Sequence, residues 1–118
     1  MKIKVNKLTG PALDWAVAKC EGRQEPEVVN NFAVAWYTWP NTHYSTSWAQ
    51  GGPIIEREKI AILSPMTGEF WDARDGKRLE TPFVYWRGPT PLIAAMRCYV
   101  ASKLGDDVTL PPELEQSA

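Results

Sequence analysis

A run of apolar residues near the C-terminus constrains the fold more than any other feature. Residues 92–101, LIAAMRCYVA, are apolar on almost every side of a helix. Thr90 is a good N-cap, Pro91 suits the first helical position and Gly105 is a stop signal, so the pattern predicts a helix over residues 90–104. A helix that is apolar all round is buried all round. In a chain of 118 residues we therefore expect it to pack against a second copy, in a homodimer or higher oligomer.

The rest of the chain predicts a second helix and a sheet. The second helix lies between the N-cap Thr9 and the stop signal Gly22, because apolar residues recur there at helical spacing. The candidate strands are Phe32–Trp36, Lys59–Leu63, Glu69–Ala73 and Phe83–Trp86, with an edge strand around Val5 as a further option. Asp75-Gly76 is a hairpin signal, placed between EFWDAR and KRLE.

These patterns indicate an α+β fold, in which a small antiparallel sheet of three to five strands carries two helices packed on it. We expect a single domain over residues 1–118. The C-terminal tail is predicted to be loosely held from about residue 109, because Pro111 and Pro112 cannot continue a helix or a central strand.

The composition argues against several classes of function. A net charge of −1 does not suit a protein that binds DNA or RNA polymers or membrane surfaces, which needs a basic excess. No apolar run is long enough to span a bilayer and the N-terminus lacks the apolar core of a signal peptide, so we expect the protein in the cytoplasm. His43 is the only histidine, and the sequence predicts neither a metal site nor a cofactor. Cys20 and Cys98 are interpreted as buried hydrophobic residues.

The segment from Tyr44 to Arg57, YSTSWAQGGPIIER, is the main candidate for a binding site. It combines large aromatic residues with a Gly-Gly-Pro corner and shows no helical or strand period for most of its length, so we predict a loop shaped to hold a ligand. Tyr44 or Trp48 would stack on a planar group. The backbone at Gly51 and Gly52 would approach phosphates. The other candidate ligand residues of this segment are Ser45, Thr46, Gln50 and Arg57.

Two features of the C-terminal helix complete the predicted site. Arg97 is the single charge inside the apolar run, and we expect its guanidinium to be mostly buried. It either forms an ion pair with Glu56 or Asp72, or it faces a pocket or partner subunit and clamps a ligand anion. The helix N-terminus at Thr90 is a further anion site, although Thr90 can also fill it as a cap.

Three blocks of sequence resemble a known family. They are MKIKVNKLTGPALDWAVAKCEG, YSTSWAQGGPIIERE and GPTPLIAAMRCYVASKLGDDV. Together they resemble the NinX-like family of small tailed-phage and prophage proteins. The resemblance implies a phage or prophage origin and brings no catalytic residues to carry over. Small accessory phage proteins often act on host processes, and one class of them sequesters the nucleotide signals of bacterial defence systems.

These observations lead to three functional hypotheses. The first is a phage accessory protein, not an enzyme, that binds and sequesters a small phosphate-bearing ligand in the cytoplasm of the infected host, such as a nucleotide immune signal. The second is a protein-binding module that inhibits a host protein through a tryptophan-rich surface. The third is a small nucleotide hydrolase that uses acidic residues among Glu56, Glu58, Asp72 and Asp75, which are otherwise interpreted as a solvated face.

Overall fold

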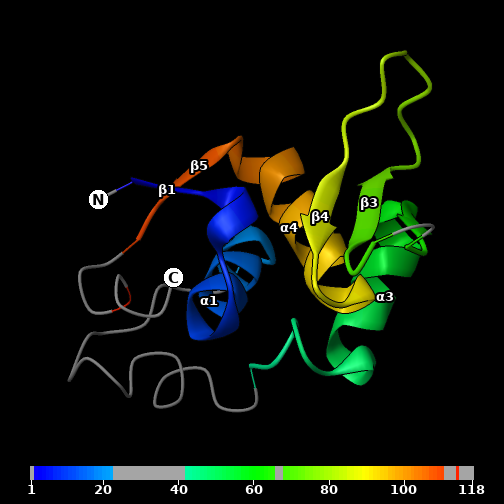
Figure 1. The fold of residues 1–118 in the computed structure, drawn as a ribbon. Coiled ribbons are helices and arrows are strands. Elements are labelled where there is room, and N and C mark those ends of the chain that lie inside the picture. The colour runs from blue at the N-terminus through cyan, green and yellow to red at the C-terminus, as the bar shows by residue number, and fades with distance from the viewer. Residues whose placement is uncertain (1, 23–41, 66–67, 111–113, 115–118) are drawn as a thin grey trace.

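The computed structural model describes residues 2–22, 42–65, 68–110 and 114 (Figure 1). The strands form two antiparallel sheets, one of three strands in the order β2-β3-β4 and one that pairs β1 with β5. The predicted α+β fold, with a small antiparallel sheet and helices packed on it, is confirmed. The elements in chain order are β1 (Lys2–Lys4), the 3₁₀ helix η1 (Val5–Lys7), α1 (Gly10–Cys20), α3 (Trp48–Glu58), β2 (Ile60–Leu63), β3 (Trp71–Asp75), β4 (Trp86–Gly88), α4 (Pro91–Leu104) and β5 (Asp107–Thr109).

Helix α4 lies at the centre of the molecule. It contacts α1, α3, η1, β5 and all three strands of the larger sheet, and in Figure 1 it lies between α1 and that sheet. Its ends are those that the sequence predicted. The Thr90 hydroxyl oxygen accepts a hydrogen bond from the Ile93 amide at 3.1 Å, and Gly105 follows the helix with a φ of 89°. Most side chains between Leu92 and Val100 are buried within the one chain.

The coverage of α4 removes the reason for expecting a second copy of the chain. One small sheet alone could not cover a helix that is apolar on all sides. The described residues cover it with a sheet on one side and with α1, α3 and η1 on others, so α4 needs no interface between subunits. The oligomeric state itself stays a prediction.

Helix α1 confirms the second helical prediction. Thr9 is its N-cap and Gly22, with a φ of 82°, follows its last turn. The seven consecutive residues from Ala12 to Ala18 are buried, and α1 packs on α4. Cys98 is buried as expected, whereas Cys20 at the end of α1 is only half-buried.

Helix α3 contradicts the prediction of a central binding loop. Residues 48–58 form a helix that packs on α4 and buries Ile54. Gly51-Gly52-Pro53 suggests a corner because glycine and proline both disfavour helices. Gly51 is instead a close-packing position: a β-carbon placed there would lie 2.6 Å from Cδ1 of Leu92. Pro53 costs the helix one hydrogen bond, to the carbonyl four residues earlier, which the packing on α4 outweighs.

The larger sheet follows the predicted order with shifted boundaries. The strand predicted at residues 59–63 is β2, while β3 begins two residues later than predicted and β4 covers 86–88 rather than 83–86. Asp75 ends β3, but residues 77–80 do not return as a hairpin strand. The Gly76 amide instead donates to the Lys59 carbonyl at 2.9 Å. Residues 76–85 form a long connection, and β4 after it pairs with β3.

The first and last described strands form the smaller sheet. Strand β1 pairs with β5 rather than with the larger sheet, with Ile3 opposite Val108. Val5 belongs to η1 and not to an edge strand. Leu110 and Leu114 are buried in the core beyond β5. The strand predicted at residues 32–36 lies outside the described residues.

Candidate functional site

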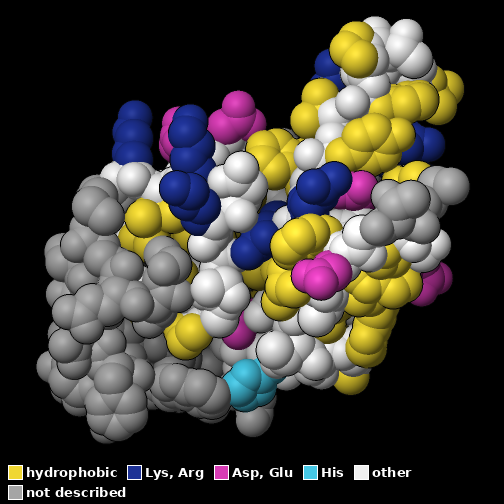
Figure 2. All heavy atoms as spheres, viewed as in Figure 1, with side chains coloured by type: hydrophobic (Ala, Val, Ile, Leu, Met, Phe, Trp, Pro, Cys, Tyr) yellow, Lys and Arg dark blue, Asp and Glu magenta, His cyan; other side chains and the backbone are white. Residues whose placement is uncertain are grey.

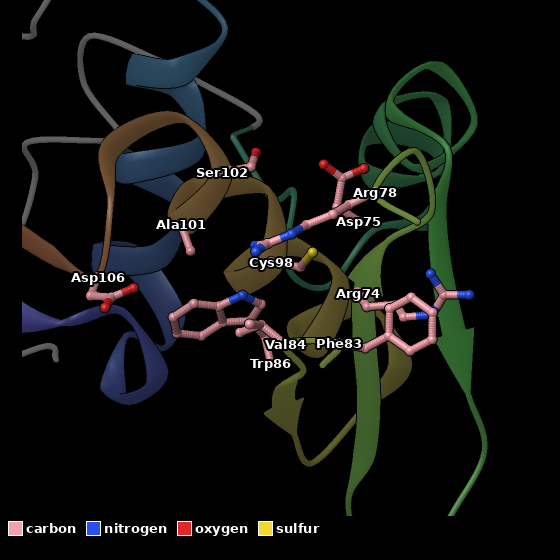
Figure 3. A pocket seen from close by; sticks show the side chains of 10 residues that line it. All are labelled: Arg74, Asp75, Arg78, Phe83, Val84, Trp86, Cys98, Ala101, Ser102 and Asp106. Atoms are coloured by element: carbon pink, nitrogen blue, oxygen red, sulfur yellow. The ribbon is translucent and has the colours of Figure 1, made fainter. Parts of the chain in front are cut away.

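A pocket lies between the β3–β4 connection and the C-terminal half of α4 (Figure 3). We call it the arginine pocket. Its volume is about 400 Å³, which is within the range of small-molecule sites. It is lined by Arg74, Asp75, Arg78, Phe83, Val84, Trp86, Cys98, Ala101, Ser102 and Asp106.

The register of the sheet explains how the pocket is formed. Trp86 of β4 lies opposite Ala73 of β3, and partners in an antiparallel pair share one face. Ala73 is fully buried and β3 packs on α4, so this is the face that meets α4. Asp75 lies two residues after Ala73, on the same face. Trp86 therefore presents its half-buried indole toward Cys98 and Ala101 of α4, where Figure 3 shows it.

Two arginines are among the lining residues. The guanidinium of Arg78 extends across the pocket, and Figure 3 shows it between Ser102 and Trp86. Arg74 alternates with Ala73 and Asp75 along β3, so its side chain lies on the other face of the strand, where its guanidinium carbon is 4.2 Å from the centre of the Phe83 ring, a cation–π contact.

Neither arginine of the pocket is neutralised by the chain. Within the part of the chain that the structure describes, neither Arg74 nor Arg78 forms an ion pair, and the Arg78 side chain makes no hydrogen bond. The Nη1 atom of Arg74 is buried without a hydrogen-bond partner among these residues. An unmet buried donor costs about 1–3 kcal/mol, and the exposed guanidinium of Arg78 is the one that extends into the pocket.

The thiol of Cys98 lies in the pocket wall but is not suited to nucleophilic chemistry. Burial raises its pKa to about 12, and the nearby charge of Asp75 acts in the same direction. The thiol is therefore protonated at neutral pH, whereas the nucleophile in cysteine chemistry is the thiolate. No cluster of three or more metal-ligating side chains exists in the described ranges.

The residues predicted from the 44–57 segment do not line this pocket. Tyr44 and Ser45 are buried in a turn that precedes α3, and the Ser45 amide donates to the carboxylate of Asp14 at 2.8 Å. Thr46 is exposed, and Trp48, at the first position of α3, is 54% exposed. The Gln50 side chain accepts a hydrogen bond from the His43 amide at 2.6 Å. Gly51 is buried against α4 and Gly52 faces open space.

Arg57 is bound by carboxylates of its own chain. Its Nη1 and Nη2 atoms donate to the two oxygens of Glu21 at 3.1 and 2.6 Å, and its Nε donates to Glu58 at 2.9 Å. A further bond joins Nη2 to the Tyr99 hydroxyl at 3.2 Å. These bonds raise the pKa of Arg57 and lower the pKa of Glu21. The side chain connects α1, α3 and α4 and has little capacity left for a ligand phosphate.

Arg97 has a structural role of a kind that we did not predict. Its Nε donates to the Leu8 carbonyl at 2.9 Å and its Nη1 donates to the Arg87 carbonyl at 2.7 Å. Burial lowers the pKa of Arg97. The half-buried side chain connects α4 to Leu8, which precedes α1, and to strand β4. Neither predicted carboxylate is its partner, since Asp72 pairs with Arg87 at 3.2 Å. Thr90 acts as the cap of α4.

The residues that line the pocket carried a signal in the sequence. Residues 74–86, RDGKRLETPFVYW, interleave basic and aromatic side chains around a turn. That combination is typical of sites that bind planar anions, because arginine pairs with the anion and an aromatic ring stacks on the plane. We interpreted Asp75-Gly76 as a hairpin turn and predicted no ligand residue in this stretch.

The family model described as Bacteriophage P22, NinX matches residues 4–103, which covers α1, α3, α4 except its last residue, and the whole arginine pocket except Asp106. No curated protein matches the chain.

Proposed function

The chain belongs to the bacteriophage P22 NinX family, and from this premise we propose that it is an accessory phage protein that binds a small phosphate-bearing ligand in the arginine pocket without transforming it. The observation that carries the proposal is the guanidinium of Arg78, which extends across the pocket beside the indole of Trp86 and has no carboxylate partner among the described residues. Arginine elsewhere in these residues is paired: Arg57 and Arg87 with carboxylates, and Arg97 with carbonyls.

The ligand chemistry follows from these side chains. A guanidinium pairs well with a phosphate oxygen, and the indole of Trp86 offers a flat surface for a base. A nucleotide combines both groups. The lining offers no evident nucleophile and base in hydrogen-bond contact, which supports retention of the ligand rather than its hydrolysis.

For a phage-encoded protein, the ligand that we propose is a nucleotide signal of host defence, which the protein sequesters in the cytoplasm of the infected cell. No described helix is long and apolar enough to cross a membrane. Sequestration requires only tight binding, so the absence of catalytic motifs from the sequence is consistent with it.

A thermal-shift series tests the proposal. Adenine and guanine nucleotides, cyclic forms included, are added to the purified protein. A nucleotide that binds raises the midpoint temperature, because at a concentration of a hundred times its Kd it adds about 2.7 kcal/mol to the free energy of unfolding. Arg78→Gln should abolish the shift and leave the free protein as stable as wild type, because the Arg78 side chain makes no hydrogen bond to the described residues. Arg87→Gln, an exposed arginine outside the pocket, is the matched control and should keep the shift.

The outcomes separate the hypotheses. If no nucleotide shifts the midpoint, or if Arg78→Gln binds as wild type does, the proposal is wrong. If the nucleotide is recovered as a cleaved product after the protein is denatured, the protein is a hydrolase and not a sequestering protein.

A protein-binding function is the alternative, and one observation favours it. Apolar side chains are exposed on the β3–β4 connection, where Leu79 is 81% exposed and Val84 and Tyr85 are 48% and 45% exposed. Figure 2 shows apolar side chains gathered over this projecting part of the molecule. Exposed apolar patches often mark interaction surfaces. The double variant Leu79→Ser and Tyr85→Ser should abolish capture of a host protein under this alternative and leave nucleotide binding unchanged.

A further inference from the structure

The arginine pocket has no surplus of positive charge. Arg78 extends its guanidinium into it, Asp75 and Asp106 contribute carboxylates, and the guanidinium of Arg74 lies against the Phe83 ring on the other face of β3. Neither carboxylate forms an ion pair with an arginine among the described residues. Asp75 accepts a hydrogen bond from the Lys77 amide at 2.9 Å and lies 3.8 Å from its ammonium group, and Asp106 is exposed. A pocket built for several phosphates would be expected to have a surplus of positive charge.

The arrangement of the charges limits where an anion can be bound. In Figure 3 the Arg78 guanidinium lies across the middle of the pocket, with the carboxylate of Asp75 above it and that of Asp106 beyond the indole of Trp86. An anion bound to Arg78 therefore has a carboxylate on either side. The guanidinium of Arg78 balances one negative charge of the ligand. Each further phosphate would lie closer to the carboxylate of Asp75 or Asp106, which repels it.

The same carboxylates are acceptors for hydrogen-bond donors of the ligand. Asp106 lines the same pocket as Trp86, so a base stacked on the indole could present its edge to that carboxylate. An ionised carboxylate only accepts hydrogen bonds, so it favours an exocyclic amine and disfavours a carbonyl at that edge. The volume of about 400 Å³ is near the lower end of ligand pockets, about 300–1,000 Å³, and suits one nucleotide unit better than two.

Building on the proposed function, we infer that the arginine pocket selects a singly charged phosphodiester of an amino-bearing base, that is, a cyclic mononucleotide, over nucleotides with terminal phosphates. The single guanidinium of Arg78, set in a pocket that also holds two carboxylates, carries this inference. A phosphodiester has one charge at neutral pH, a terminal phosphate close to two, and a triphosphate more.

Calorimetric titration of the wild-type protein with cyclic AMP, AMP and ATP tests this selectivity. We expect cyclic AMP to bind most tightly, AMP more weakly and ATP at least about tenfold more weakly than cyclic AMP. Cyclic IMP, which has a carbonyl in place of the amine, should bind more weakly than cyclic AMP. The double variant Asp75→Asn and Asp106→Asn should bring the ATP affinity to within a few-fold of the cyclic AMP affinity.

The variants have matched controls. Asparagine keeps the oxygen that accepts the Lys77 amide, and a thermal melt of each variant checks that it is folded. Asp106→Asn alone changes an exposed residue and serves if the double variant does not fold. Asp72→Asn removes a carboxylate that lies outside the pocket and pairs with Arg87, and it should leave the selectivity of wild type unchanged.

Failure of the inference is distinguishable from failure of the proposed function. If ATP binds wild type as tightly as cyclic AMP does, or if the Asp→Asn variants keep the wild-type ratio, the selectivity is wrong although the pocket still binds nucleotides. If none of the four probes binds the folded wild-type protein, both the selectivity and the proposed nucleotide-binding function are wrong.

Discussion

At the scale of single residues, Arg97 shows that a charge in an apolar helix need not mark a ligand site. Its Nε and Nη1 atoms donate to the carbonyls of Leu8 and Arg87. Arg97→Met leaves both carbonyls without these donors, and we expect it to lower the free energy of unfolding by about 2 kcal/mol. Urea denaturation measures this loss. Nucleotide binding by the folded variant should be unchanged.

Arg87→Met provides the comparison for Arg97. Arg87 is exposed and pairs with Asp72 on the surface, and such pairs contribute about 0–1 kcal/mol. A result in which Arg97→Met kept its stability but lost nucleotide binding would contradict the structural role and return Arg97 to the ligand site.

Asp14 is a residue whose charge opposes folding. It is buried in α1, and burial raises its pKa, although the hydrogen bond from the Ser45 amide and the charge of His43 partly offset this. Because the folded pKa lies above the unfolded value of about 3.9, the protonated form is the one that favours folding. The contribution of protonated Asp14 to the free energy of unfolding is complete below the unfolded pKa. It is lost as pH rises through the folded pKa.

Asp14→Asn should therefore stabilise the protein at neutral pH. Asparagine keeps the acceptor for Ser45 and has no charge to desolvate. Thermal melts should show a higher midpoint for the variant at neutral pH and no difference at about pH 4 or below, where Asp14 is increasingly protonated. Asp106→Asn, at an exposed position, should show no such gain. A variant less stable than wild type at neutral pH would show that the carboxylate has a favourable partner.

At the scale of elements, the sequence identified the helices whose ends carry chemical signals and missed the one whose signals conflict. Helices α1 and α4 each have an N-terminal threonine cap and a glycine after the last turn. Helix α3 has Gly51, Gly52 and Pro53 in its first half, and it ends at Lys59, which has a positive φ of 54°. It is stabilised by tertiary packing on α4 rather than by local preference, and tertiary packing overrides helix propensity.

The two adjacent glycines of α3 give a matched test of that packing. Gly51→Ala places a β-carbon 2.6 Å from both Leu92 and the Tyr44 carbonyl, so we expect a loss of about 1–3 kcal/mol. Gly52→Ala meets no atom within 4 Å and should stabilise the helix by about 0.5–1 kcal/mol. Chemical denaturation of both variants measures the difference. Equal effects would mean that α3 does not pack on α4 as closely as described.

At the scale of the whole molecule, the sequence predicted which elements exist better than it predicted where they meet. Asp75, Arg78 and Trp86 come from a strand, a connection and a second strand, and only the pairing of β3 with β4 brings them together beside α4. No local pattern encodes that pairing. The predicted ligand residues were drawn from contiguous segments, and Arg57 and Arg97 were engaged by partners 36 and 89 positions away in the chain.

The central position of α4 has a consequence for how the molecule opens. Helix α4 contacts both sheets and the other described helices, so its amides cannot reach solvent unless most of these contacts are lost together. In deuterium exchange, the amides from Ala94 to Val100 should exchange only through global unfolding, at rates that follow the total stability of the protein. The exposed connection at residues 77–82 should exchange within seconds to minutes by local opening. Exchange in α4 that is insensitive to a destabilising change such as Gly51→Ala would show that the helix opens on its own.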